Sequence, residues 1–399
     1  MTMAAASSEV AFVRKLLNLP ACGYFTSAYK HSLDTIPRGQ AECQWYPPRN
    51  KQRPKAIIVF YPGNPGLVEY YPPFLHKLRS LIPPSYGLIS LGHIGHSLTL
   101  SFQTQHLTLR EQIQVKVEFV EKLRKELDAW REEEQAEGGG GGGKGDSGQT
   151  MIGLMGHSVG AEIAVQTIRG LEEPERAIST ITTEPSNGSA RLEKQPQQRI
   201  TAAFLLFPTL AHIAKTPNAL RLRPLFYSPL LELAPLLVVL LKPIFLIIHF
   251  AYWLFPSLRQ PATSSSSIYA PNPTTITMLE TPIVVSHVLR LARSEMETIL
   301  EPDLAWYARN GQAGNGRVFS YWGADDGWVG KEGDAVKRVL RGEKESAESE
   351  EVHGDDEGTV ERVIDCQDNI PHAFCLAHSD MIAEKVAEWV KHAFKQKQL

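Results

Sequence analysis

A five-residue turn in the middle of the chain constrains the fold more than any other feature. An apolar run beginning at Met151 leads into Gly156-His157-Ser158-Val159-Gly160, and a helical pattern of apolar residues follows. A serine on a sharp strand-to-helix turn has a strained backbone, and small residues two positions before and after it prevent clashes between the two elements. The start of the helix directs free backbone N–H groups toward the same point. We therefore predict that Ser158 is a nucleophile, although the five-residue pattern alone also fits an ordinary loop.

Short apolar segments alternate with amphipathic segments along the rest of the chain. This alternation predicts an α/β fold, with a mostly parallel sheet and helices on both of its faces. Strands are predicted at 23–29, 43–46, 55–61, 86–91, 151–155, 200–207, 317–322 and 360–366. Helices are predicted at 9–19, 70–81, 108–136 and 379–394, and directly after Ser158.

In parallel sheets the working site lies at the carboxyl ends of the strands, and this rule assigns an edge to each insertion. The glycine run Gly138–Gly143 and the acidic stretch Gly342–Gly358 precede strands, so we expect both at the opposite edge. The long segment Pro208–Asn315 follows a strand and is expected to rise over Ser158 as a cap. The predicted organisation is an entry segment at 1–50, a core formed by 51–207 and 316–399, and a cap at 208–315.

Composition narrows the class of protein. The net charge of −3 gives no reason to expect binding to nucleic acid. The segment Met1–Leu19 lacks the basic start and continuous apolar core of a signal peptide. The cysteines are too few and too scattered for a disulfide framework or a zinc site: Cys22, Cys43, Cys366 and Cys375. We expect a protein that faces the cytosol and binds no metal.

A serine hydroxyl needs a neighbouring base, and the base needs a group that orients it. In folds with this serine turn, the order along the chain is serine, acid, histidine. The predicted strand at 317–322 leads into Asp325 and Asp326, and the strand at 360–366 leads into His372. We expect His372 to take the proton of Ser158, and one of the two aspartates to orient its ring. This chemistry requires no metal and no organic cofactor.

The oxyanion of an acyl-transfer intermediate requires two backbone donors, each typically worth ~3–4 kcal/mol of the barrier. One is expected to be the N–H of Val159, directly after the nucleophile. The other should come from the loop after the strand at 55–61, where Gly63 and Asn64 are candidates and Pro65 has no N–H. We favour Asn64.

Three segments together resemble the lipid droplet-associated hydrolase family, in the same order and over roughly residues 54 to 390. They are Phe-Tyr-Pro-Gly-Asn-Pro-Gly at 60–66 with Glu-Tyr-Tyr at 69–71, Gly-His-Ser-Val-Gly at 156–160, and Asn-Ile-Pro-His-Ala-Phe at 369–374. The resemblance implies an α/β-hydrolase fold, Ser158 as nucleophile and His372 as base. It also implies Asp326 rather than Asp325 as the acid, because the family's aspartate stands two residues before a tryptophan. The glycine run, the polar tract before Ile200 and the acidic stretch depart from the family, but none contains a motif residue.

The resemblance further implies a serine lipid-ester hydrolase of lipid droplets and the cytosolic face of the endoplasmic reticulum, with sterol esters as one suggested substrate. Two alternatives stay open. The chain could be a droplet-binding structural or regulatory protein whose site turns over slowly or not at all. It could also be an acyltransferase or thioesterase, because the acyl-enzyme is common to these reactions and only the acceptor differs.

The segment Leu230–Phe255 is the most apolar part of the chain. Its two apolar halves, Leu236–Leu241 and Ile244–Phe255, are separated by Lys242-Pro243, and each is shorter than the ~20 residues that cross a bilayer. A hairpin that enters one leaflet or a droplet monolayer fits this pattern, with Tyr252 and Trp253 at the interface. A cap packed over the active site fits equally well, and a single spanning helix kinked at the proline fits less well.

Overall fold

The computed structural model describes residues 24–100, 105–137, 148–173, 200–227, 231–240, 243, 272–311, 316–343 and 360–395. The helix predicted at 9–19, the glycine run and most of the acidic stretch lie outside these ranges, as does Cys22.

An eight-stranded sheet forms the centre of the fold, in the order β1-β2-β4-β3-β5-β6-β7-β8. β2 is antiparallel to both of its neighbours, and the strands from β4 to β8 pair in parallel. The mostly parallel sheet is therefore confirmed, although the last strand is shorter than predicted. The strands are β1 (Phe25–Lys30), β2 (Gln40–Tyr46), β3 (Ala56–Tyr61), β4 (Tyr86–Leu91), β5 (Met151–His157), β6 (Ala202–Leu206), β7 (Val318–Trp322) and β8 (Val363–Asp365).

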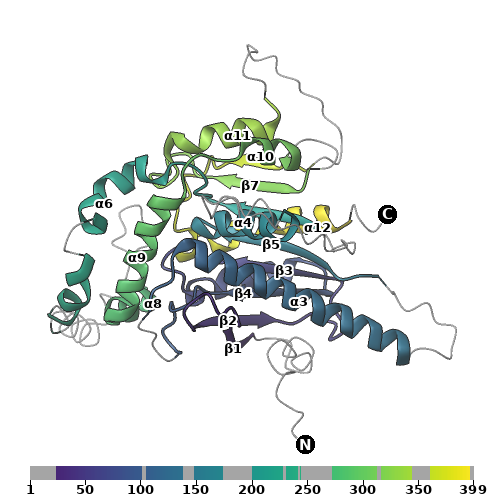
Figure 1. Ribbon diagram of the computed structural model, residues 1–399. Coiled ribbons are helices and arrows are strands. Elements are labelled where there is room, and N and C mark those ends of the chain that lie inside the picture. The colour runs from purple at the N-terminus through teal and green to yellow at the C-terminus, as the bar shows by residue number, and fades with distance from the viewer. Residues whose placement is uncertain are drawn as a thin grey trace, which may run out of the picture.

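Helices cover both faces of this sheet (Figure 1). Successive side chains of a strand point to opposite faces, so Ile57 and Val59 of β3 join one core and Ile58 and Phe60 join the other. The first core also contains residues of α3 (Leu109–Glu137), α4 (Val159–Glu172), α10 (Leu304–Gly311) and α11 (Asp334–Arg341). The second contains residues of α2 (Pro72–Leu81) and α12 (Ser379–Lys395).

The segment predicted as a cap leaves the sheet after β6. Figure 1 shows its helices α6, α8 and α9 gathered on the left, at one end of the strands, and α9 packs against α3. The last helix of the predicted range, α10, packs instead against α11 and β7 of the core. We keep the name cap for the following elements of this segment: η2 (Ile213–Lys215), α6 (Pro217–Tyr227), a helix at Leu231–Leu240, α8 (Pro273–Leu279) and α9 (Pro282–Thr298).

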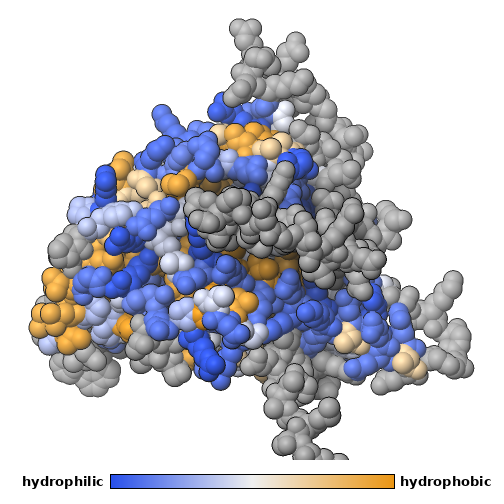
Figure 2. All heavy atoms as spheres, in the orientation of Figure 1, coloured by the Kyte–Doolittle hydropathy of each residue, from blue (hydrophilic) through white to orange (hydrophobic). Residues whose placement is uncertain are grey.

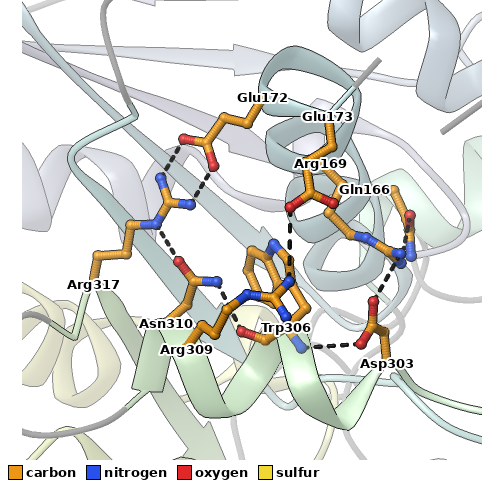
Figure 3. A network of polar contacts seen from close by, with 9 residues as sticks. All are labelled: Gln166, Arg169, Glu172, Glu173, Asp303, Trp306, Arg309, Asn310 and Arg317. Atoms are coloured by element: carbon orange, nitrogen blue, oxygen red, sulfur yellow. Dashed lines mark hydrogen bonds and ion pairs between the residues drawn. The ribbon is translucent and has the colours of Figure 1, made fainter. Parts of the chain in front are cut away.

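A polar network anchors the far end of α4, the helix that begins after Ser158 (Figure 3). The buried guanidinium of Arg317 makes a two-pronged contact with Glu172 and donates to Asn310 Oδ1 at 2.8 Å. Arg169 pairs with Asp303 at 3.0 Å, one turn earlier on the same helix. Bidentate charge-assisted hydrogen bonds are strong and fix the relative geometry of their partners, so this network holds α4 against α10 and the start of β7.

Candidate active site

The turn at Ser158 has the strained geometry that its sequence predicts. Ser158 has φ 56° and ψ −125°, a conformation that residues with a side chain rarely adopt. A Cβ atom on Gly156 would lie 1.9 Å from the Gly160 carbonyl oxygen, and one on Gly160 would lie 2.2 Å from the Tyr61 carbonyl oxygen. Both contacts are with backbone, so only glycine fits at these two positions.

Two of the predicted site residues, Ser158 and Asp326, lie within hydrogen-bond distance of a third, His372, although all three are far apart in the sequence. His372 Nε2 is 2.8 Å from Ser158 Oγ, and His372 Nδ1 is 2.6 Å from Asp326 Oδ2. Because a carboxylate only accepts, Nδ1 carries the ring proton and Nε2 accepts from the serine hydroxyl. The arrangement can therefore deprotonate the hydroxyl as it attacks a carbonyl carbon.

The structure also distinguishes the two aspartates that the spacing left open. The Asp326 side chain is 2% exposed, and its second oxygen, Oδ1, accepts the backbone N–H of Trp328 at 2.9 Å. Asp325 lies on the exposed side of the same turn. One residue thus both stabilises the turn and contacts His372, as the family resemblance implies for Asp326.

The loop after β3 lies directly beside the serine. A Cβ atom on Gly63 would be 2.8 Å from Ser158 Cβ, so the backbone comes closer than a side chain at this position would permit. The Gly63 N–H donates to Tyr71 Oη at 3.1 Å and is therefore already engaged. Among the described residues, the N–H groups of Asn64 and Val159 donate to no acceptor. These two residues remain the proposed oxyanion donors.

The side chain of Asn64 reaches into the cap, a contact that the sequence did not predict. Its Nδ2 donates to the Val288 carbonyl oxygen at 3.0 Å and to Glu295 Oε1 at 2.9 Å, both on α9. Glu295 is fully enclosed, and burial raises the pKa of its carboxyl group to about 8. The cap helix therefore holds the loop that carries a proposed oxyanion donor.

We expect Glu295 to make folding less favourable as the pH rises. Below its ordinary pKa of 4.5, both the folded and unfolded states hold the proton. Between 4.5 and about 8 only the folded state keeps it, so the free energy of unfolding falls, by up to ~1.4 kcal/mol per pH unit. In Glu295→Gln this pH-dependent fall should disappear. The free energy of unfolding of the variant should therefore rise relative to that of wild type as the pH increases from 5 to 8. Urea denaturation at several pH values measures this.

The matched control is Glu297→Gln, which changes a carboxylate on the same helix that pairs at the surface with Arg293. We expect its stability to follow that of wild type across this pH range. Parallel pH curves for wild type and Glu295→Gln would contradict a raised pKa at Glu295.

A cavity of about 730 Å³ lies on the outer side of α4, between α3, α10 and the segment 298–303. Glu162 contributes to its wall, and burial raises the pKa of that carboxyl group to about 7. None of Ser158, His372, Asp326 and Asn64 lines this cavity, so it is not the space in which an ester would meet the nucleophile.

A family model described as lipid-droplet associated hydrolase matches residues 54–375. The chain belongs to this family. The lipid droplet-associated hydrolase of Pongo abelii is 22% identical over 346 residues, which cover 85% of this chain and 86% of the relative. That of Dictyostelium discoideum is 23% identical over 364 residues, with 90% and 95% covered. Similarity thus extends over most of each protein.

Solved structures with a similar course of the chain include two hydrolases of low sequence identity. A bacterial membrane phospholipase A is 13% identical with a TM-score of 0.49, covering 96% of this chain and 91% of that one. A siderophore hydrolase from Aspergillus fumigatus is 14% identical with a TM-score of 0.42, covering 94% and 99%. Family membership and the sheet described above confirm the predicted α/β-hydrolase fold, and this lipid droplet-associated hydrolase family member is a hydrolase.

Proposed function

We propose that this chain is a serine hydrolase that cleaves acyl esters of lipids at the surface of lipid droplets, with sterol esters among its substrates. The observation that carries the proposal is the 2.8 Å approach of His372 Nε2 to Ser158 Oγ, together with the 2.6 Å contact between His372 Nδ1 and Asp326 Oδ2. We further propose that it acts on droplets and on the cytosolic face of the endoplasmic reticulum.

The proposed reaction has two halves. Ser158 Oγ bonds to the ester carbonyl carbon while its proton passes to His372 Nε2, and the oxyanion is held by the N–H groups of Asn64 and Val159. The C–O bond to the alcohol then breaks, and His372 returns the proton to the departing oxygen. Water attacks the acyl-enzyme in the same way and releases the fatty acid and free Ser158. Asp326 holds the His372 ring and stabilises its positive charge in both halves.

Exposed apolar side chains of the cap support a lipid surface as partner. In the helix Leu231–Leu240 one set of residues packs inward, with Leu231 2% and Val238 9% exposed. A second set forms what we call the apolar face, joined by residues of α6: Leu220, Leu222, Tyr227, Leu233, Leu236, Leu237, Val239 and Leu240. Their exposed fractions run from 39% to 63%, and Figure 2 shows hydrophobic atoms at the side of the molecule where Figure 1 draws the cap.

A group of exposed apolar side chains of this kind typically marks a site of interaction. Arg221 and Arg223, exposed on α6 beside the apolar face, would meet the phosphates of a phospholipid monolayer. Within the described ranges, no single helix is long and apolar enough to cross a membrane. The pair Pro217–Tyr227 and Leu231–Leu240, bent by 84°, meets the requirement only when taken together, by length and composition.

We expect the double substitution Leu236→Ser and Leu240→Ser to weaken binding to triacylglycerol droplets coated with phosphatidylcholine by about 10-fold or more. Burial of one leucine is worth about 1.5–3 kcal/mol, and the two side chains are 54% and 63% exposed. Flotation of the protein with the droplets measures binding. Hydrolysis of a short, water-soluble ester should stay unchanged, as should droplet binding by the control Met381→Ser, whose side chain is exposed on α12. Undiminished flotation of the double variant would exclude the apolar face as the contact.

A substrate panel separates the proposed reaction from its alternatives. Purified protein should release fatty acid from sterol or glyceryl esters presented as an emulsion, in preference to thioesters. Transfer of the acyl group to an added alcohol at the expense of water would instead indicate an acyltransferase.

A further inference from the structure

A chain of hydrogen bonds behind the site connects the three loops that form it. The Gly63 N–H donates to Tyr71 Oη at 3.1 Å, and Tyr71 Oη lies 2.8 Å from His157 Nδ1. The other ring nitrogen of His157, Nε2, is 2.8 Å from the backbone carbonyl oxygen of His372. These hydrogen bonds thus connect the loop after β3, the serine turn and the loop after β8.

The direction of every hydrogen bond in this chain is determined. The His372 carbonyl oxygen only accepts, so His157 Nε2 carries the proton and Nδ1 is left as an acceptor. Tyr71 must then donate to Nδ1 and accept from Gly63. Burial, and secondarily the neighbouring His372, holds the pKa of His157 well below its ordinary value, which keeps the ring in the neutral form that this pattern requires. Burial also raises the pKa of Tyr71, so its hydroxyl keeps its proton.

Aromatic packing leaves the two side chains little freedom. Tyr71 and His157 are 3% and 4% exposed. The His157 ring lies edge-on to Phe374 at 4.9 Å and to Phe207 at 6.1 Å, measured between centroids. In such an enclosed place an unpaired polar group is costly, so the hydrogen bonds hold the loops in one relative position.

We propose that Tyr71 and His157 are positioning residues for the hydrolysis. His157 bonds to the backbone of His372 and fixes the ring of that residue relative to Ser158, and Tyr71 fixes Gly63 so that the next N–H, that of Asn64, faces the oxyanion. Neither residue touches the reacting atoms in this arrangement. The inference rests on the catalytic roles proposed above for Ser158, His372 and Asn64.

The test compares Tyr71→Phe with Tyr70→Phe, because the two tyrosines are adjacent and each loses one buried hydroxyl. Tyr70 Oη is 2.9 Å from Thr275 Oγ1 in the cap and takes no part in the hydrogen bonds that connect the three loops. We expect Tyr71→Phe to lower kcat on a water-soluble ester by about 10- to 100-fold with KM within about twofold, the scale of a small misplacement of catalytic groups. Labelling of Ser158 by a fluorophosphonate should slow in proportion, and Tyr70→Phe should retain both rates.

Substitutions of His157 provide the rescue. His157→Phe removes the hydrogen bonds to Tyr71 and His372 and should lower kcat as much as Tyr71→Phe does. His157→Gln keeps a donor for the His372 carbonyl oxygen and should recover most of the rate. A kcat for folded Tyr71→Phe within twofold of wild type, or equal losses in Tyr70→Phe and Tyr71→Phe, would overturn the inference. Failure of the proposed function looks different, because wild type itself would then show no hydrolysis dependent on Ser158.

Discussion

Replacement of Ser158 by alanine should reduce ester hydrolysis to the background of the assay, a loss of about 10³- to 10⁶-fold in kcat for enzymes of this mechanism. The hydroxyl removed is the atom that His372 Nε2 approaches to 2.8 Å, and no other group occupies its position. Folding should be retained, because alanine keeps the Cβ atom and Ser158 Oγ makes no other hydrogen bond within the described residues. Release of fatty acid from an emulsified ester measures the loss.

The control for this variant is Ser80→Ala, which removes a hydroxyl exposed on α2. It should hydrolyse esters at the wild-type rate. The same pair of variants addresses the alternative of a structural droplet protein. If Ser158→Ala changed droplet size or lipid content in cells as little as Ser80→Ala does, the cellular role would not depend on catalysis.

Substitution of the two neighbouring aspartates should have opposite outcomes. Asp326→Asn should lower kcat by about 10⁴-fold, the scale known for the equivalent change in serine proteases, because an amide donor facing Nδ1 favours the wrong tautomer of His372. Asp325→Asn changes an exposed side chain in the same turn and should keep kcat within about twofold.

The two aspartate variants remove the same charge one residue apart, so a general electrostatic effect would appear in both. Steady-state kinetics on a water-soluble ester gives kcat and KM for each, and thermal unfolding verifies the fold. A large loss in Asp325→Asn with a small one in Asp326→Asn would reverse the assignment of the acid.

Apolar runs predicted the strands well because buried parallel strands carry apolar side chains on both faces, as in β3 and β5. Boundaries were less certain where local chemistry intervenes. Helix α2 begins only at Pro72, since the preceding residues form the short turn η1 (Val68–Tyr70). The last strand pairs over Val363–Asp365 alone, and no feature of the run 360–366 indicates where its pairing starts.

The predicted fold gave the order of serine, acid and histidine along the chain. It did not predict the contacts that hold these three residues in place. Glu295 and Asn64 are far apart in the sequence and lie in segments without a common pattern, and the same holds for Tyr71 and His157. Such pairs depend on how the cap and the loops pack together. The sequence shows that Tyr71 belongs to a pair of tyrosines and that His157 directly precedes the nucleophile. No sequence feature indicates a hydrogen bond between the two side chains.

The segment Leu230–Phe255 was ambiguous for a physical reason. A helix with a single apolar face packs that face against one neighbouring surface, whereas Leu231–Leu240 is apolar around most of its circumference. One side packs inward and the other is exposed, so the described part combines features of a packed cap and of a lipid-binding surface. The residues from 244 to 255 lie outside the described ranges, and the hairpin stays a prediction.

The central claim is that Ser158 is the residue that becomes acylated. Its most direct test is to inactivate the full-length protein with a fluorophosphonate and to locate the adduct by tandem mass spectrometry of its peptides. The account predicts one phosphonyl group, on Ser158, formed in step with the loss of ester hydrolysis and absent after heat denaturation. An adduct on another residue, or full hydrolysis by protein that carries the adduct on Ser158, would contradict it.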